Sequence, residues 1–103
     1  MALVKHVYQL TDKFPASEAF GLTAQTRRAA VSIPSNLAEG AARAGAKEFA
    51  QFLNIAKGSL SELETQILIA KELGYTGDVG EVMNHAEKVS RLLAGLHKKV
   101  LAG

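Results

Sequence analysis

Apolar residues recur along the chain at alternating steps of three and four positions, the period of an α-helix that buries one face. The pattern predicts helices over about residues 2–13, 22–43, 47–73 and 79–101, with no alternation of the kind that marks β-strands. The connections are short, which makes consecutive helices antiparallel. The predicted fold class is therefore all-α, a single domain over residues 1–103 built as an antiparallel up-and-down four-helix bundle.

The third predicted helix carries two stripes. The first keeps heptad spacing through apolar residues, namely Phe49, Leu53, Ala56, Leu60, Leu63, Ile67 and Ala70. The second mixes apolar and polar residues, namely Phe52, Ile55, Ser59, Glu62, Gln66, Ile69 and Leu73. A helix with two semi-apolar faces contacts more than one neighbour. We expect this helix either to lie centrally or to be covered by another subunit.

A proline, Pro34, lies inside the second predicted helix. Proline removes one backbone hydrogen bond and clashes with the preceding turn. Two interpretations are open: one kinked helix, or two helices broken near Ser32. The apolar period continues through the proline in phase, which favours the kinked helix.

The short turn around Gly45 sets a register between the second and third helices. If they fold back on each other there, facing residues have numbers that sum to about 91. Ser32 then faces Ser59, and Gln25 faces Gln66. Polar residues meet polar residues along a predicted structural polar seam, made of Gln25, Arg28, Ser32, Asn36, Glu39, Arg43, Glu48, Ser59, Glu62 and Gln66.

Two interpretations of the seam are open. In the structural one, Arg28 and Glu62 form an ion pair that fixes the register, and losing one partner of a buried pair costs ~3–5 kcal/mol. It predicts that Arg28→Ala costs more stability than Arg27→Ala. In the other, Arg28, Glu39, Arg43 and Glu62 line a site for a ligand or a partner.

The same register makes two further predictions. Next to the turn, Arg43 is expected to face Glu48. Farther along, Gly58 is expected to face Ile33, and a glycine there permits close backbone approach at a cost of ~1 kcal/mol in helix propensity.

The composition is that of an ordinary globular domain. The chain has 103 residues, of which 48% are hydrophobic and 21% charged, so disorder is not expected. It contains no cysteine, which excludes disulfides and thiolate catalysis. No stretch approaches the ~20 apolar residues that span a bilayer. We expect no membrane association and a cytoplasmic location.

The sequence carries no recognisable motif for catalysis or metal binding. The three histidines, His6, His85 and His97, include no pair at the i, i+4 spacing of a helical metal clamp, and there is no HExxH. The glycines form no GxGxxG or GxxxxGK loop, and no Ser, His and Asp set is identifiable. We therefore predict no catalytic residues, no cofactor, no metal site and no enzymatic activity.

The formal net charge is +2, which is low for a protein that binds a phosphate backbone strongly. A ring of subunits can nevertheless concentrate charge on one face. The candidate residues for nucleic-acid contact are the basic ones that cluster along the chain, namely Arg27, Arg43, Lys47, Lys88, Arg91, Lys98 and Lys99.

A run of residues from Phe14 to Tyr75 resembles a bacterial four-helix-bundle family first noticed as proteins encoded in intervening sequences of 23S rRNA genes. The residues that carry the resemblance are Gln25, Arg28, Ala29, Ala30, Ser32, Ile33, Asn36, Ala38, Glu39, Gly40, Arg43, Glu48, Phe49, Phe52, Leu53, Ile55, Ala56, Gly58, Ser59, Glu62, Leu63 and Glu64. The family is similar in fold to the accessory variability determinant of diversity-generating retroelements, a basic pentamer that binds nucleic acid and its reverse transcriptase. This chain departs from that relative in being far less basic.

The resemblance implies a ring-shaped homo-oligomer, with a homopentamer as the expected form. Members of the family mostly have no assigned biochemical activity. Our functional hypothesis is a non-enzymatic oligomeric scaffold or adaptor that binds another macromolecule. The alternative is direct binding of RNA or DNA through basic faces of the oligomer. The expected partners are a second copy of the chain and RNA, DNA or a nucleic-acid-handling protein.

Overall fold

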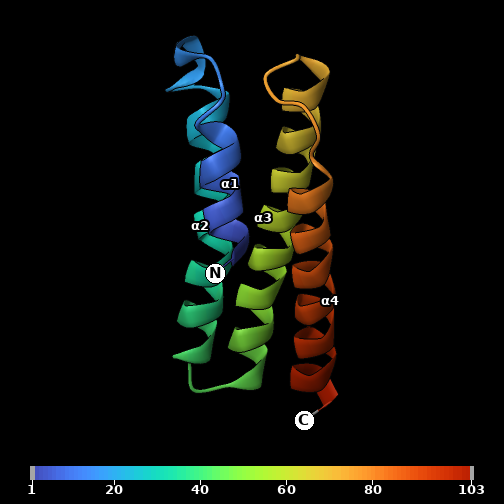
Figure 1. The fold of residues 1–103 in the computed structure, drawn as a ribbon. Helices are drawn as coiled ribbons and strands as arrows, with labels where there is room; N and C mark the ends of the chain where they lie inside the picture. The colour runs from blue at the N-terminus through green and yellow to red at the C-terminus, as the bar shows by residue number, and fades with distance from the viewer. Residues whose placement is uncertain (1, 103) are drawn as a thin grey trace.

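Helices make up almost all of the computed structural model, which describes residues 2–102 (Figure 1). The elements in order are α1 (Ala2–Thr11), the short 3-10 helix η1 (Ala16–Glu18), α2 (Leu22–Ala41), α3 (Ala46–Glu72) and α4 (Gly80–Ala102). Consecutive α-helices run in opposite directions in Figure 1, and residues 2–102 contain no strand. The all-α, four-helix prediction is confirmed, with helix ends within two residues of those expected.

The core is formed by the apolar stripe of each helix. The first stripe of α3 is buried almost throughout, since Leu53, Ala56, Leu63, Ile67 and Ala70 are fully enclosed. Buried residues of the other helices pack against it in one continuous cluster, including Leu3, Val7, Ala30, Ile33, Val82, Ala86 and Leu93. The helical period of apolar residues therefore identified the core-facing side of every helix.

Helix α2 is continuous through Pro34. Of the two interpretations of this proline, the break near Ser32 is wrong. Proline lacks the N–H that would bond to the carbonyl of Ala30. Ile33 before the proline is fully buried, and Leu37 after it packs against the core. Burial of the apolar face on both sides of the proline keeps the helix in one piece.

The connections at the α1–α2 end are tied together by Glu18. One carboxylate oxygen accepts a hydrogen bond from the backbone N–H of Leu22 at 3.1 Å, and the other accepts one from the Tyr75 hydroxyl at 2.8 Å. These two bonds, the backbone one first, hold the pKa of Glu18 below its usual value, and the same contact raises the pKa of Tyr75. Glu18 thus caps α2 and anchors it to the α3–α4 connection.

Helix α3 is terminated by a glycine that follows its last turn. Gly74 has a positive φ of 78°. Its N–H bonds to the carbonyl of Lys71 at 3.0 Å, and the N–H of Tyr75 bonds to that of Ala70 at 2.9 Å, the pattern of a Schellman motif. Farther along, Asp78 accepts a hydrogen bond from the Gly80 N–H at 2.8 Å, which supports the start of α4.

The close approach of α2 and α3 occurs at a different glycine from the one predicted. A methyl group added at Gly40 would lie 2.8 Å from Phe52 Cβ, whereas one added at Gly58 would meet nothing within 4 Å. Gly58 is exposed and Ile33 is fully buried. The prediction that Gly58 permits the approach is therefore wrong: the tight contact between the two helices lies at Gly40, near the turn.

None of the helices in residues 2–102 has both the length and the apolar character needed to cross a bilayer. The cytoplasmic location stays a prediction.

Candidate functional site

The middle of the predicted polar seam forms as the register requires. The hydroxyl groups of Ser32 and Ser59 lie 2.9 Å apart and share a hydrogen bond between α2 and α3. Asn36 supports this pair by donating to the Ser32 carbonyl at 2.8 Å and to its hydroxyl at 2.9 Å. The contact confirms that residues summing to 91 face each other at this point.

The predicted ion pair between Arg28 and Glu62 does not form. Both residues are exposed, and no ion pair in residues 2–102 includes either of them. Glu62 instead accepts a hydrogen bond from Gln66, one turn along its own helix, at 3.2 Å. Arg28 lies beside Val31 and Tyr8 in a shallow groove between α1 and α2. Opposed positions on two helices do not form an ion pair when both side chains extend outward to solvent.

Arg27, next to Arg28 in the sequence, is the arginine whose guanidinium is fixed by contacts with other side chains. Its guanidinium donates to Asp12 at 2.8 Å and to the Thr11 hydroxyl at 2.7 Å, and it lies 4.6 Å from the centre of the Tyr8 ring. It therefore links α2 to the end of α1. The predicted order of the two alanine substitutions is reversed, because Arg28 makes no equivalent contacts.

At the turn end of the seam, Arg43 had been predicted to face Glu48. It lies in the turn just after α2 and pairs instead with Glu39 in the last turn of that helix. Its guanidinium also lies 5.2 Å from the centre of the Phe52 ring. Glu48 is exposed, as is Gln25 at the other end of the seam. The seam is therefore a central Ser32–Ser59–Asn36 cluster whose charged ends are open to solvent.

The second stripe of α3 lies at the edge of the core and is partly exposed. Ile55, Ile69 and Leu73 are 51%, 44% and 55% exposed, and they recur on one side of the helix. Gln66 lies among them, is only 6% exposed, and its Oε1 has no hydrogen-bond partner within residues 2–102. We call Ile55, Ser59, Glu62, Gln66, Ile69 and Leu73 the α3 outer stripe.

The basic residues are dispersed, and several have acidic neighbours. Arg27 pairs with Asp12, and Arg91 lies 3.6 Å from Glu87 one turn away. The exposed lysines among the candidates for nucleic-acid contact are Lys47, Lys88, Lys98 and Lys99. One end of the molecule gathers basic groups from two helices, since Arg43 and Lys99 line the same groove there with Phe49, Leu96 and Val100.

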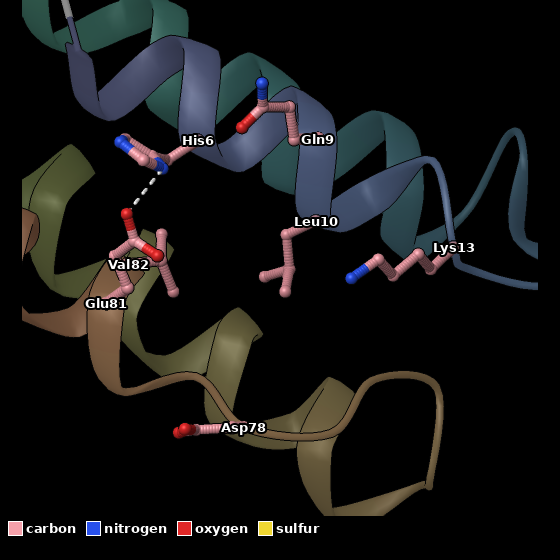
Figure 2. Close-up of a pocket in the computed structure, with 7 residues that line it drawn as sticks. All are labelled: His6, Gln9, Leu10, Lys13, Asp78, Glu81 and Val82. Atoms are coloured by element: carbon pink, nitrogen blue, oxygen red, sulfur yellow. Dashed lines mark ion pairs between the residues drawn. The ribbon is translucent and has the colours of Figure 1, made fainter.

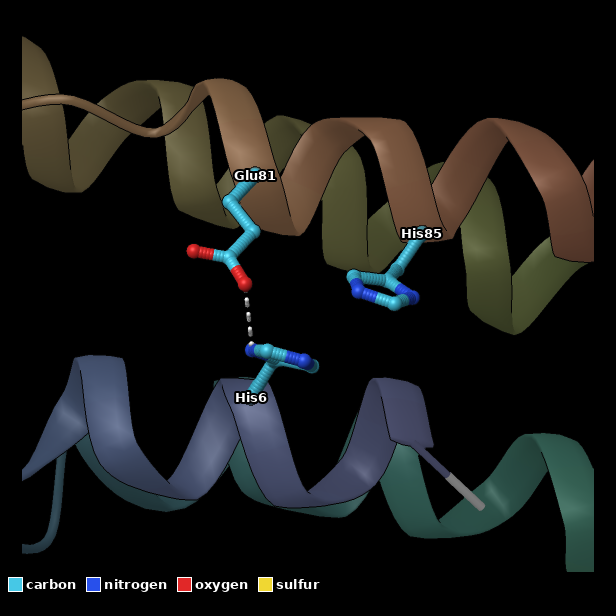
Figure 3. Close-up of side chains that lie close together, drawn as sticks. All are labelled: His6, Glu81 and His85. Atoms are coloured by element: carbon cyan, nitrogen blue, oxygen red, sulfur yellow. Dashed lines mark ion pairs between the residues drawn. The ribbon is translucent and has the colours of Figure 1, made fainter.

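A cluster that the sequence patterns did not predict lies between α1 and α4. The side chains of His6, Glu81 and His85 point toward one another across the two helices (Figure 3). The imidazole rings are stacked with centres 4.2 Å apart and planes 24° apart, and His6 Nδ1 lies 3.8 Å from Glu81 Oε1. One donor atom from each residue lies within 4.8 Å of the other two.

This cluster adjoins a groove of about 160 Å³ between α1 and the start of α4 (Figure 2). His6 and Glu81 stand at one end of the groove, and Lys13 stands at the other, while Asp78 lines it from the segment before α4. Leu10 lies between them and provides an apolar floor. The groove gives small solutes access to the cluster from solvent.

The sequence held part of the signal for this cluster. Glu81 and His85 are four residues apart, so they share one face of α4. The i, i+4 pattern of two histidines does not include this pair, which combines a glutamate with a histidine. His6 could not have been added from its position in the chain, because only the packing of α1 on α4 brings it to the same place.

Comparison with models of protein families identifies a family that covers most of the chain. The family model described as 23S rRNA-intervening sequence protein matches residues 1–95, which is nearly the whole chain and includes all of α1, α2 and α3. A search of curated proteins found no significant match.

Proposed function

The chain belongs to the 23S rRNA-intervening sequence protein family, and from that premise we propose that it is a non-enzymatic, homo-oligomeric four-helix scaffold that binds another macromolecule. The observation that carries the proposal is the α3 outer stripe. Three large aliphatic side chains, Ile55, Ile69 and Leu73, stand about half exposed on one side of a long helix.

Burying the exposed halves of these side chains favours association. Full burial of an isoleucine or leucine is worth about 1.5–3 kcal/mol, so the exposed half of each contributes about 1 kcal/mol. A stripe of this kind on a small helical domain is typical of a surface that another chain covers. We take a second copy as the covering chain, assembled as a ring, with the homopentamer that the family resemblance implies as the expected form.

The charged residues at the stripe also support a second copy as the covering chain. Glu62 belongs to the stripe, and Arg28 lies on the neighbouring helix α2. Both are exposed and have no ion-pair partner within residues 2–102. In a ring, each copy presents one surface to a neighbour and a different surface to the next. These two charges can then form ion pairs with charged residues on the different surface of the next copy.

The test is the molar mass in solution, measured by light scattering on a size-exclusion column at micromolar concentration. Wild-type protein should elute as a multiple of its 10.9 kDa chain mass. Ile69→Glu should dissociate it, because a carboxylate would be buried among apolar groups. Leu92→Glu on α4, at an equally exposed position, is the matched control and should not. Dissociation by Leu92→Glu with retention of the oligomer by Ile69→Glu would overturn the proposal.

The second macromolecule is sought by affinity capture from the native cell, with both protein and nucleic acid identified. Wild type and Ile69→Glu are compared as baits. A partner recovered with the wild type and lost with Ile69→Glu supports an assembled scaffold. Equal recovery by both would show that assembly is not needed for binding.

The second candidate function is direct binding of RNA or DNA. One observation favours it: Arg43 and Lys99 meet in a single groove at the end of the bundle where α2 turns into α3. In a ring these ends would come together, and so would their charge. Retention on a filter should then fall steeply with salt. Lys99→Glu should reduce it more than Lys88→Glu, and an absence of retention at low salt rules this function out.

A further inference from the structure

We propose that His6, Glu81 and His85 form a binding site for a divalent transition-metal ion that joins the first helix to the last. Two imidazole nitrogens and one carboxylate oxygen are a donor set that Zn²⁺ uses in proteins. Imidazole also suits Ni²⁺ and Cu²⁺, whereas Mg²⁺ and Ca²⁺ favour oxygen ligands alone. The carboxylate of Glu81 provides the negative charge that attracts the cation.

The donor atoms lie close enough together that a small movement of the side chains would let them bind one ion. Zn²⁺ binds nitrogen and oxygen at about 2.0–2.2 Å, so donors on a tetrahedral ion lie about 3.3 Å from one another. In the cluster, His6 Nδ1 and Glu81 Oε1 are 3.8 Å apart, and all three donors lie within 4.8 Å. The stacked rings must turn so that their nitrogens converge. The terminal torsion of histidine is broad, which makes such a turn inexpensive.

The backbone already holds the ligands in the required arrangement. Glu81 and His85 are one turn apart on α4, and His6 reaches them from α1 (Figure 3). No hydrogen bond within residues 2–102 occupies the imidazole nitrogens or the Glu81 carboxylate, beyond the 3.8 Å His6–Glu81 contact. The imidazoles are half-buried, whereas the Glu81 carboxylate is exposed. The alternative is that the two histidines only pack against each other. That would explain their stacking, but it would leave the imidazole nitrogens and the carboxylate without a partner.

Three protein ligands leave a fourth coordination position for water, and the groove beside His6 and Glu81 connects the cluster to solvent. The consequence for the fold follows from the connectivity. Helix α1 is the shortest of the four α-helices. A metal shared between His6 and the Glu81–His85 pair ties this helix to α4 and stabilises the folded chain by mass action.

The experiment titrates Zn²⁺ into the full chain, purified without a histidine tag, by calorimetry and by thermal melting. We expect one ion per chain, and a rise in Tm of about 10 °C or more once free Zn²⁺ is about 100 times Kd. His6→Gln, Glu81→Gln and His85→Gln should each weaken binding at least tenfold. His97→Gln is the matched control, a histidine on α4 outside the cluster, and should leave the affinity unchanged.

Melting of each variant without metal shows whether it folds, so loss of binding by a folded variant is meaningful. Co²⁺ provides a second readout, because a protein-bound tetrahedral ion absorbs strongly in the visible range and a hydrated ion does not. The proposal is overturned if wild type does not bind, if the cluster variants bind as wild type does, or if His97→Gln loses affinity equally. It is also overturned if Zn²⁺ binds only by bridging separate chains, seen as half an ion per chain with a doubled particle mass.

Discussion

The close approach of α2 and α3 at Gly40 makes the sharpest stability prediction. In Gly40→Ala, the new methyl group would lie 2.8 Å from Phe52 Cβ and 3.0 Å from Phe49 Cδ1. Carbon atoms in contact normally lie about 3.5–4.0 Å apart. The Cβ atom of Phe52 is attached to the backbone and cannot swing aside. The two helices must therefore separate.

The magnitude follows from two opposing effects. Overpacking of a well-packed interface costs typically 1–3 kcal/mol, and the short distance to a Cβ atom places this substitution at about 3 kcal/mol. Alanine regains about 1 kcal/mol of helix propensity over glycine. The net loss is about 2 kcal/mol, or a fall in Tm of about 10 °C for a domain of this size.

The matched control is Gly95→Ala. Gly95 lies inside α4, and a methyl group there would meet nothing within 4 Å. Only the propensity gain applies, so this variant should be more stable than wild type by about 0.5–1 kcal/mol. Urea denaturation followed by circular dichroism measures both variants. Gly40→Ala as stable as wild type, or Gly95→Ala clearly less stable, would refute the packing analysis.

Three further predictions concern single side chains. Arg27→Ala should cost about 1 kcal/mol and Arg28→Ala less than half of that, because only the former removes the bonds to Asp12 and Thr11; equal urea midpoints would contradict this. Glu18→Ala should lower Tm near about pH 7, and its difference in Tm from wild type should close as the pH falls below about 4. The lowered pKa of Glu18 gives stability that is present above the ordinary carboxyl pKa and lost when the carboxylate is protonated. A difference in Tm that stays constant down to about pH 3 would show that the carboxylate charge is not involved. Gly74→Ala should cost about 1 kcal/mol, because its φ of 78° is strained for any residue with a Cβ; an unchanged Tm would contradict the assigned backbone conformation.

The period of apolar residues was enough to predict the four helices and the side of each that faces the core. The reason is physical, since one face of every helix must be buried and the period identifies that face. The continuous helix through Pro34 was favoured on the same ground. The Ser32–Ser59 contact followed from the length of the turn at Gly45, which fixes the register of two antiparallel helices.

The choice of partner for each charged side chain could not be predicted in the same way. Arg43 and Glu62 each have a partner four residues away in the sequence, and these local contacts replaced the predicted contacts across the seam. The placement of Gly40 against Phe52, and of His6 against Glu81, depends on how far apart the helix axes lie. That spacing is set by all the side chains between them, which no pairwise pattern encodes.

The central claim is that a second copy covers the α3 outer stripe. The chain has no cysteine, so a single thiol introduced by Ile69→Cys reports on that position alone, and Leu92→Cys provides the reference on α4. The measurement is the rate at which each thiol reacts with a maleimide at micromolar protein concentration. Both positions are similarly exposed in the single chain. The account predicts that the thiol at position 69 reacts at least tenfold more slowly, and equal rates would contradict it.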